Sequence, residues 1–278
     1  MNRKSGSRML FDVAATLVAI YLGLVAAAWL GRGALIYPGT WLRAGETSVI
    51  PSAARWEHVP AEGEAPVHAF YLPPPPGARL PAPVTVHFHG NGEIAGDRRD
   101  LIAFYRARGH AVLLPEYRGY GGAGGRPGYA EIAADARVFL DRLLALPEID
   151  GTRLVLHGTS LGSTFATEAA ASHPPAALVL ESAFTSIGAL AWRRGLPGVL
   201  LGTDYDTSSR LPAIAAPVFV IHGDADRVVP HDMGETLASL SPRATFVSVP
   251  GADHVLDLAD RRFAGPLAAF LDRALARR

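Results

Sequence analysis

Three residue types that together can turn a hydroxyl group into a nucleophile occur in the order serine, aspartate, histidine along the second half of the chain. A serine hydroxyl is a poor nucleophile at neutral pH. It needs a base to take its proton, an acid to orient that base, and N–H donors for the oxyanion that forms. Ser160, Asp226 and His254 are our candidates for nucleophile, orienting acid and base. Together they predict acyl transfer to water through an acyl-enzyme.

Ser160 lies at the centre of residues 158–162, which read Gly-Thr-Ser-Leu-Gly. Residues 154–157 are typical of a strand and residues 161–171 of a helix. A strand that turns directly into a helix holds the central residue in strained backbone geometry, and glycines two positions to either side relieve the crowding. The helix start also favours negative charge nearby. The alternative is a serine that only caps the helix.

The two partners of the serine are expected on loops that follow strands. His254 comes after the last expected strand, where its side chain can reach back over the sheet; an exposed loop histidine is the alternative. Asp226 follows an earlier strand, and Asp224 in the same loop competes with it. Asp224 is the first residue of the turn and can bond the loop backbone, so Asp226 is preferred. Asp253 is expected to point away from the site.

The oxyanion is expected to be held by two backbone N–H groups, those of Leu161 and Asn91. Asn91 lies in residues 89–93, which read His-Gly-Asn-Gly-Glu and follow an expected strand. Glycines there let the backbone approach a ligand closely, although a plain glycine turn fits the same pattern. Other histidines on or beside strands are expected to serve packing or loop bonding: His87, His89 and His157.

The elements that must position these residues alternate between strand and helix. Short apolar strands separated by helices favour a mostly parallel sheet with helices on both faces. Strands are expected at 67–72, 84–88, 111–114, 154–156, 177–180, 218–221 and 245–249, and helices at 98–108, 130–146, 161–171, 231–240 and 263–276. Residues 182–217 lack this rhythm, which predicts a short cap insertion at 183–216 over the strand ends.

The N-terminal part predicts export. Residues 1–8 are basic, and residues 9–30 are mostly apolar and about as long as the roughly 20 residues that cross a bilayer as a helix. The basic flank predicts a cytoplasmic N-terminus, with the rest of the chain on the other side, periplasmic or extracellular. A cleaved signal peptide, which would make the protein secreted, and a buried core helix are the alternatives. Residues 31–66 are expected to be a connecting stretch with short strand pieces, before a catalytic domain at 67–278.

Composition excludes several other classes of protein. Apolar residues make up 49% of the chain and charged residues 19%, which suits a globular core. The formal net charge is zero, so there is no electrostatic footprint for nucleic acid. There is no cysteine for a disulfide, a thiolate nucleophile or a cysteine-bound zinc, and the 10 histidines are too scattered for a metal cluster. No metal is expected.

With these motifs in order, the chain resembles the α/β-hydrolase superfamily over about residues 60–275, and more narrowly its Bem46-like membrane-anchored serine hydrolases. Serine, aspartate and histidine follow one another in the order of that fold. The motifs that carry the likeness are Tyr-Pro at 37–38, His-Gly-Asn at 89–91, Tyr-Arg-Gly-Tyr-Gly at 117–121, the serine motif at 158–162, Glu-Ser-Ala-Phe-Thr-Ser at 181–186 and His-Gly-Asp-Ala-Asp at 222–226. One departure is Ser163, where many relatives have glycine or alanine.

The resemblance implies an eight-stranded sheet, no cofactor, and hydrolysis of an ester or thioester by a serine esterase. With an anchor and a small cap, the expected substrate is a small-molecule or lipid-like acyl compound met at the membrane. Two other functions stay open. One is a membrane-tethered binding protein that uses the scaffold without catalysis, and the other is a serine peptidase.

Overall fold

The computed structural model describes residues 3–61 and 63–276, and its centre is one eight-stranded sheet. The strand order is β1-β2-β4-β3-β5-β6-β7-β8, in which the pairs β1–β2 and β2–β4 are antiparallel and the other pairs are parallel. The strands are β1 (Ala54–His58), β2 (Val67–Leu72), β3 (Ala82–Phe88), β4 (Ala111–Pro115), β5 (Ile149–Thr159), β6 (Ala177–Glu181), β7 (Val218–Gly223) and β8 (Ala244–Val249). The predicted mostly parallel, eight-stranded sheet is confirmed.

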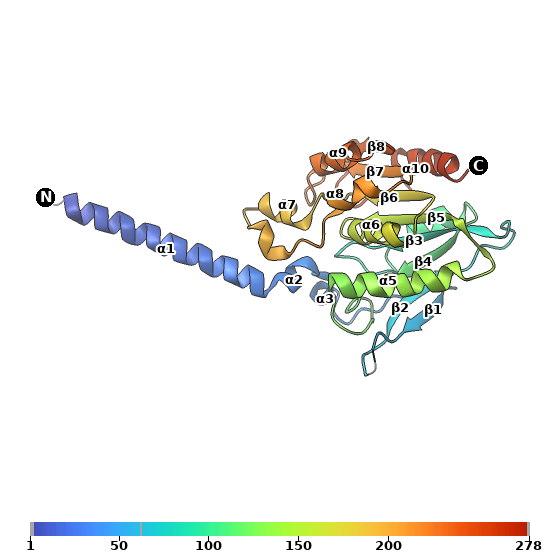
Figure 1. The fold of residues 1–278 in the computed structure, drawn as a ribbon, viewed down its shortest axis with the longest axis horizontal. Coiled ribbons are helices and arrows are strands. Elements are labelled where there is room, and N and C mark those ends of the chain that lie inside the picture. The colour runs from blue at the N-terminus through green and yellow to red at the C-terminus, as the bar shows by residue number, and fades with distance from the viewer. Residues whose placement is uncertain (1–2, 62, 277–278) are drawn as a thin grey trace.

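Helices cover both faces of the sheet, as predicted (Figure 1). Alternate strand residues face opposite layers. Leu113 packs in the core shared with α5, α6 and α9, whereas its neighbours Val112 and Leu114 pack in the core shared with α4 and α10. These helices are α4 (Arg99–Arg106), α5 (Tyr129–Leu144), α6 (Gly162–Ser172), α9 (His231–Ser239) and α10 (Arg261–Ala274). All the expected helices and strands occur, and β5 extends furthest beyond its expected range.

The excursion between β6 and β7 is short, in agreement with the expected small cap. It consists of four brief helical pieces: α7 (Ile187–Trp192), η1 (Gly198–Leu201), α8 (Thr207–Arg210) and η2 (Leu211–Ala213). The side chain of Ser186 caps α7 by accepting a bond from the N–H of Ala189, and Asp206 caps α8 in the same way. The excursion lies beside the strand ends that carry the candidate site.

A long helix, α1 (Arg3–Leu30), projects away from the rest of the molecule (Figure 1). Its apolar part, Phe11–Leu30, is 20 residues long with a mean hydropathy of 2.2, and none of it is buried inside the protein. A helix of that length and composition can cross a bilayer, and an uncleaved signal sequence has the same properties. A core helix would be covered by protein, so the third reading of this segment is disfavoured.

Residues 31–66, expected as a connecting stretch, hold two short helices and the edge strand β1. The helices are α2 (Arg32–Ile36) and α3 (Gly39–Leu42). Ile36 and Tyr37 are almost completely buried, and Trp56 of β1 stacks on Tyr71 of β2. Parts of this stretch are therefore packed into the hydrophobic core, and it reaches the candidate site described next.

Candidate active site

Ser160 stands at the turn between β5 and α6, in a backbone conformation that side chains rarely adopt. Its φ is +52°, and its N–H donates a 2.8 Å hydrogen bond to the carbonyl of Glu181 at the end of β6. The glycines on either side are required by space. A Cβ at position 162 would lie 2.0 Å from the carbonyl oxygen of Phe88, and one at position 158 would lie 2.4 Å from the Cα of Ser163. The expected strained turn is therefore present.

The histidine and aspartate predicted from the sequence lie in line with this serine. His254 Nε2 is 3.0 Å from Ser160 Oγ, and His254 Nδ1 is 2.8 Å from Asp226 Oδ2. The side chain of Asp226 is fully buried, whereas that of His254 keeps 16% of its surface exposed. A buried acid, a partly accessible imidazole and a hydroxyl at hydrogen-bond distance are the geometry needed to transfer a proton from the hydroxyl.

Asp226 is held in its ionised form by its surroundings. Burial alone would raise its pKa, but hydrogen bonds from His222 and His254 and from the backbone keep the pKa of this carboxyl well below its usual range. His222 Nε2 lies 3.0 Å from Asp226 Oδ2, and the N–H groups of Val228 and Val229 donate to Oδ1 at 2.7 and 2.8 Å. The carboxylate is thus fixed from several sides before it meets His254.

The two neighbouring aspartates, Asp224 and Asp253, bind elsewhere. Asp224 accepts a 2.6 Å hydrogen bond from the N–H of Gly251, and so ties its loop to the loop of His254. Asp253 binds the backbone N–H and the guanidinium of Arg227 on the surface. Of the three carboxylates near His254, only Asp226 contacts the imidazole among the described residues.

The loop of Asn91 lies beside the serine. A Cβ built on Gly90 would be 3.7 Å from the Cβ of Ser160. The carbonyl of Gly90 accepts a 2.8 Å bond from Nδ1 of His89, which orients the peptide whose N–H belongs to Asn91. Within residues 3–61 and 63–276, neither this N–H nor that of Leu161 has a protein acceptor at hydrogen-bond distance. Donors without a protein acceptor are what an oxyanion site requires.

The backbone carbonyl of Asn91 is bound by residues that include the stretch after α1. The carbonyl of Asn91 accepts bonds from the N–H of Gly39 and from the hydroxyl of Tyr120, both at 3.0 Å. Arg43 donates to the carbonyl of Gly92 at 3.3 Å. A Cβ at Gly39 would lie 2.1 Å from the ring of Tyr120, so only glycine allows this approach. Nothing in the motif pattern of residues 31–66 indicated this contact.

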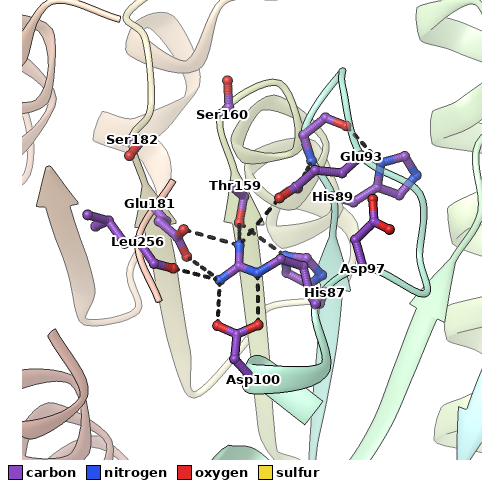
Figure 2. Close-up of polar contacts among 12 residues, drawn as sticks. His87, His89, Glu93, Asp97, Asp100, Thr159, Ser160, Glu181, Ser182 and Leu256 are labelled. Atoms are coloured by element: carbon purple, nitrogen blue, oxygen red, sulfur yellow. Dashed lines mark hydrogen bonds and ion pairs between the residues drawn. The ribbon is translucent and has the colours of Figure 1, made fainter. Parts of the chain in front are cut away.

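A buried arginine, Arg98, joins three parts of the site from below. Its guanidinium donates to Thr159 Oγ1 at 3.0 Å, to Glu181 Oε1 at 3.1 Å and to the carbonyl of Leu256 at 3.2 Å. In Figure 2 the contacts of Thr159, Glu181 and Leu256 meet at this guanidinium below Ser160. Asp100 contacts the guanidinium from the side that faces away from Ser160. Arg98 thus links the residue before the serine, the strand end that binds the serine N–H, and the loop of His254.

The positive charge of Arg98 is compensated by the buried carboxylate of Glu181. Burial alone would raise the pKa of Glu181, but Arg98 and the hydrogen bond from His157 lower that pKa to about 2. Sequence reasoning missed Arg98, because four charged residues of both signs at 97–100, next to a helix start, are typical of a solvated surface. The one available signal was its position between the glycine-containing loop at 89–93 and the helix that follows.

Two further histidines, His87 and His157, are buried and serve local structure. His87 Nε2 lies 3.1 Å from Thr159 Oγ1, and burial lowers the pKa of His87 well below its usual range. His157 lies between Tyr105 and Glu181. Among the described residues, no group of three or more His, Cys, Asp or Glu is arranged to hold a metal ion.

The loop 116–122 supports the site through two separate buried contacts. Glu116 lies 3.1 Å from His89 Nε2 and accepts a bond from Ser48, and this carboxylate helps to raise the pKa of His89 against the effect of burial. Arg118 pairs instead with Asp135 of α5 at 2.7 Å. The departure at Ser163 also has a local role, because its hydroxyl donates a 2.8 Å bond to the carbonyl of Gly158.

Comparisons with known proteins agree with this fold. Residues 80–202 match the family model described as serine aminopeptidase, S33. An uncharacterized protein of Mycobacterium tuberculosis is 34% identical over 247 residues, which cover 87% of each chain. Protein bem46 of Schizosaccharomyces pombe is 28% identical over 62% of this chain and 61% of its own length. Among solved structures, the ferulic acid complex of Est1E from Butyrivibrio proteoclasticus has a TM-score of 0.68 at 18% identity, covering 80% of this chain and all of that one.

The chain therefore belongs to the α/β-hydrolase superfamily. Within that superfamily it belongs to the Bem46-like group, whose curated relatives here also include the α/β-hydrolase domain-containing protein WAV2 of Arabidopsis thaliana, 28% identical over 68% of each chain. The resemblance and the fold class inferred from the motifs are both confirmed.

Proposed function

We propose that this protein is a serine hydrolase that cleaves carboxylic ester or thioester bonds through an acyl-enzyme. The observation that carries the proposal is the continuous line of hydrogen-bond distances from Asp226 through His254 to Ser160, 2.8 and then 3.0 Å. A residue that served only as a helix cap would not need a strained φ and a histidine in line with its hydroxyl.

In the first half of the reaction, Ser160 Oγ attacks the carbonyl carbon of the substrate while His254 Nε2 takes the hydroxyl proton. The oxyanion that forms accepts hydrogen bonds from the N–H groups of Leu161 and Asn91. Asp226 stabilises the imidazolium through Nδ1. When the tetrahedral intermediate collapses, the bond to the leaving alkoxide or thiolate breaks, and that group receives the proton from His254.

In the second half, water repeats these steps on the acyl-enzyme. His254 takes a proton from water, the hydroxide adds to the acyl carbon, and the same two N–H groups hold the new oxyanion. Collapse releases the carboxylic acid and returns the proton to Ser160 Oγ. No cofactor enters any of these steps.

Ester substrates fit the similar proteins best. The solved structures that share this fold include the esterase Pf2001 of Pyrococcus furiosus, with a TM-score of 0.64 at 18% identity. The family model is described as a serine aminopeptidase, which keeps a peptidase as the second candidate. A peptidase of that kind needs a carboxylate for the substrate ammonium, but the nearby Glu93 already accepts a 2.8 Å bond from the N–H of Gly90.

The placement in the cell follows from α1. In our proposal residues 9–30 form a single membrane-spanning anchor behind the basic segment 1–8, with the N-terminus cytoplasmic and the catalytic domain on the opposite side of the membrane. Secretion after cleavage is the alternative. An enzymatic reporter that is active only after export, fused after Arg278, is expected to be active. A silent reporter would reverse the proposed orientation.

A fluorophosphonate probe tests the chemistry directly. It should label the wild-type protein on Ser160 and leave Ser160→Ala unlabelled. Equal labelling of both proteins, or none of the wild type, would contradict the nucleophile. A panel of nitrophenyl esters of increasing chain length, acyl thioesters and aminoacyl anilides then separates esterase, thioesterase and peptidase. Absence of turnover on the whole panel would favour the binding protein.

A further inference from the structure

Exposed apolar side chains outside α1 gather where α1 meets the rest of the protein. Five of them form what we call the α2–α7 face: Leu35 of α2, Trp41 and Leu42 of α3, Trp192 of α7 and Val199 of η1. The elements that carry them are contiguous, because η1 packs against both α1 and α2 as well as against α7. They lie on the side of the molecule from which α1 projects (Figure 1).

The distribution of tryptophan singles out the same face. Three of the four tryptophans are exposed, with 50% of Trp29, 58% of Trp41 and 71% of Trp192 accessible, whereas Trp56 on the edge strand is 7% exposed. Trp29 is next to the last residue of α1, and Trp41 donates from its indole to the carbonyl of Ala34 in α2. Exposed tryptophans grouped in this way are typical of the boundary between hydrocarbon and water.

Distance along the chain brings this face to the level of the lipid headgroups. The apolar part of α1 ends at Leu30, and Leu35 lies five residues later in the sequence. At 1.5 Å per residue, five residues of helix cover about 7.5 Å. The polar headgroup layer on each side of the hydrocarbon core is of similar depth, roughly 5–8 Å. If Leu30 sits at the edge of the hydrocarbon, α2 lies within the headgroup layer.

Charge around the face suits an anionic surface. Residues 31–45 and 183–203 contain no aspartate or glutamate, and their charged residues are Arg32, Arg43, Arg193 and Arg194. Arg43 pairs with Glu46 and Asp97, and Arg193 pairs with Asp232, so the arginines without a carboxylate partner among the described residues are Arg32 and Arg194. Arginines beside an apolar surface are attracted to anionic lipids while the apolar side chains enter the boundary region.

We infer that the α2–α7 face lies on the surface of the bilayer that α1 enters, and that the candidate active site opens toward that surface. This inference rests on the proposed anchor and the proposed hydrolase. The two halves of the face flank the site. Gly39 of α3 donates to the carbonyl of Asn91, and Arg194 after α7 donates to the carbonyl of Val228 in the loop of Asp226 at 2.6 Å.

The substrate class follows from this position. An ester or thioester whose acyl chain is embedded in the lipid can present its carbonyl at the headgroup level, where Ser160 lies between the two halves of the face. The acyl chain then does not have to leave the hydrocarbon to be cleaved. The proposed substrates are therefore lipid-borne acyl compounds of the anchoring membrane.

Absence of cysteine makes the placement directly measurable. Single cysteines at Val199→Cys and Leu42→Cys in the full chain would carry a nitroxide label, with Leu30→Cys as the anchor control and Val138→Cys on α5 as the solvent control. The proteins are reconstituted in vesicles of phosphatidylcholine and phosphatidylglycerol. Accessibility is then compared for oxygen, which concentrates in lipid, and for a water-soluble nickel chelate.

We expect the labels at positions 199, 42 and 30 to favour oxygen and the label at 138 to favour the nickel chelate. If positions 199 and 42 behave like 138 while 30 favours oxygen, the face is not on the membrane although the anchor stands. If position 30 also favours the nickel chelate, the proposed anchor itself fails. Shielding of 199 and 42 from both reagents would mean that protein covers the face, a partner or a second copy, and would overturn the inference.

Activity provides an independent measurement of the substrate class. The double variant Trp192→Ser, Val199→Ser is compared with Val138→Ser, using one ester held in vesicles and one short soluble ester. We expect kcat/KM on the vesicle ester to fall about tenfold in the double variant, the order expected from losing part of the burial of two apolar side chains. The soluble ester should be cleaved at an unchanged rate.

An equal loss on both esters would contradict the role in substrate access, because it would point to damage at the site. No loss on either ester would contradict it as well. If the wild type cleaves neither ester, the proposed function fails, and the labelling result then decides the placement alone.

Discussion

The hydroxyl of Ser182 donates a 2.7 Å hydrogen bond to the backbone carbonyl of His254. Ser182 is fully buried, follows β6 as Ser160 follows β5, and shares its unusual backbone conformation with a φ of +49°. The end of one strand thus holds the loop that carries the proposed base of the reaction. Two adjacent strand ends therefore supply the nucleophile and a support for its partner.

Loss of this support should slow the reaction without affecting substrate binding. Ser182→Ala removes the only side-chain donor that binds the His254 carbonyl in the described residues. Small displacements of a catalytic group can cost up to about 100-fold in rate. We expect kcat to fall between about 10-fold and 100-fold with KM little changed. Ser172→Ala, at the far end of α6, is the matched control, and an unchanged kcat in Ser182→Ala would contradict the support.

Replacing each of the two aspartates in the loop after β7 should show which of them orients His254. Asp226→Asn can present an amide N–H to His254 Nδ1 and so favour the wrong tautomer, which should lower kcat by about 10⁴-fold while the fold is kept. Asp224→Asn keeps an oxygen that can accept the bond from the N–H of Gly251 and should retain most of its kcat. Steady-state kinetics on a soluble ester decide between them. The assignment is wrong if Asp224→Asn is the more damaging change.

Removing only one partner of the ion pair between Arg98 and Glu181 should lower the folding stability more than replacing both partners would suggest. Arg98→Met leaves the buried carboxylate of Glu181 without its cation, which typically costs about 3–5 kcal/mol of folding free energy. Arg98→Met combined with Glu181→Gln should be less destabilised than the sum of the single changes. Urea unfolding of the full chain in detergent measures all three. The exposed Arg262 beside Asp260 serves as control, and Arg262→Met should leave the unfolding midpoint unchanged.

Stability should decrease in mild acid through the buried histidine His110. Burial, with help from Arg153 and Arg108, lowers the pKa of His110 from 6.5 to about 3. Between these pH values the unfolded chain binds a proton at this position and the folded chain does not, so folding stability falls as the pH falls. The contribution is at most about 1.4 kcal/mol per pH unit.

His110→Asn keeps a polar atom near Thr85, whose Oγ1 lies 2.9 Å from the imidazole Nδ1. It should give a shallower dependence of unfolding free energy on pH from 6.5 down to 3. Denaturant unfolding at a series of pH values provides the comparison. Parallel curves for wild type and variant would show that His110 does not contribute to the acid sensitivity.

The backbone strain at Ser160 should make an inactive glycine variant more stable to unfolding than an inactive alanine variant. A side chain in the left-handed region costs roughly 1–2 kcal/mol relative to the usual conformation, and glycine avoids that cost. Ser160→Gly should therefore unfold at a higher urea concentration than Ser160→Ala, with a difference of about 1 kcal/mol, although both are inactive. Equal stability of the two variants would argue against strain at this turn.

Much of the site was readable from the sequence because its members follow strands. Ser160, Asp226 and His254 lie where parallel strands end, and such ends meet at one edge of the sheet. Local patterns say little about contacts between distant segments. Arg98 looked like a surface charge, and its burial depends on acceptors from β5, β6 and the loop after His254. Gly39 gave no signal either, since its role depends on the approach of Asn91 and Tyr120.

The strand pattern shows the same division. β2 was expected over the range that it occupies, because residues 67–72 alternate enough to indicate a strand and the four prolines at 73–76 end it. β1 has only one buried residue among five, so its pairing with β2 depends on a partner that the local sequence does not indicate.

The bond from Gly39 to Asn91 also limits where the chain can be shortened. Proteolytic removal of everything up to the three alanines at 26–28 would release a form without the apolar helix. In that form the N–H of Gly39 would still bind the carbonyl of Asn91. A cut only a dozen or so residues further on would remove Gly39 and leave the carbonyl of Asn91 with Tyr120 alone. The position at which a signal peptidase would cut and the position at which a protease would inactivate the protein would then be separated by a length of chain equal to about three turns of helix.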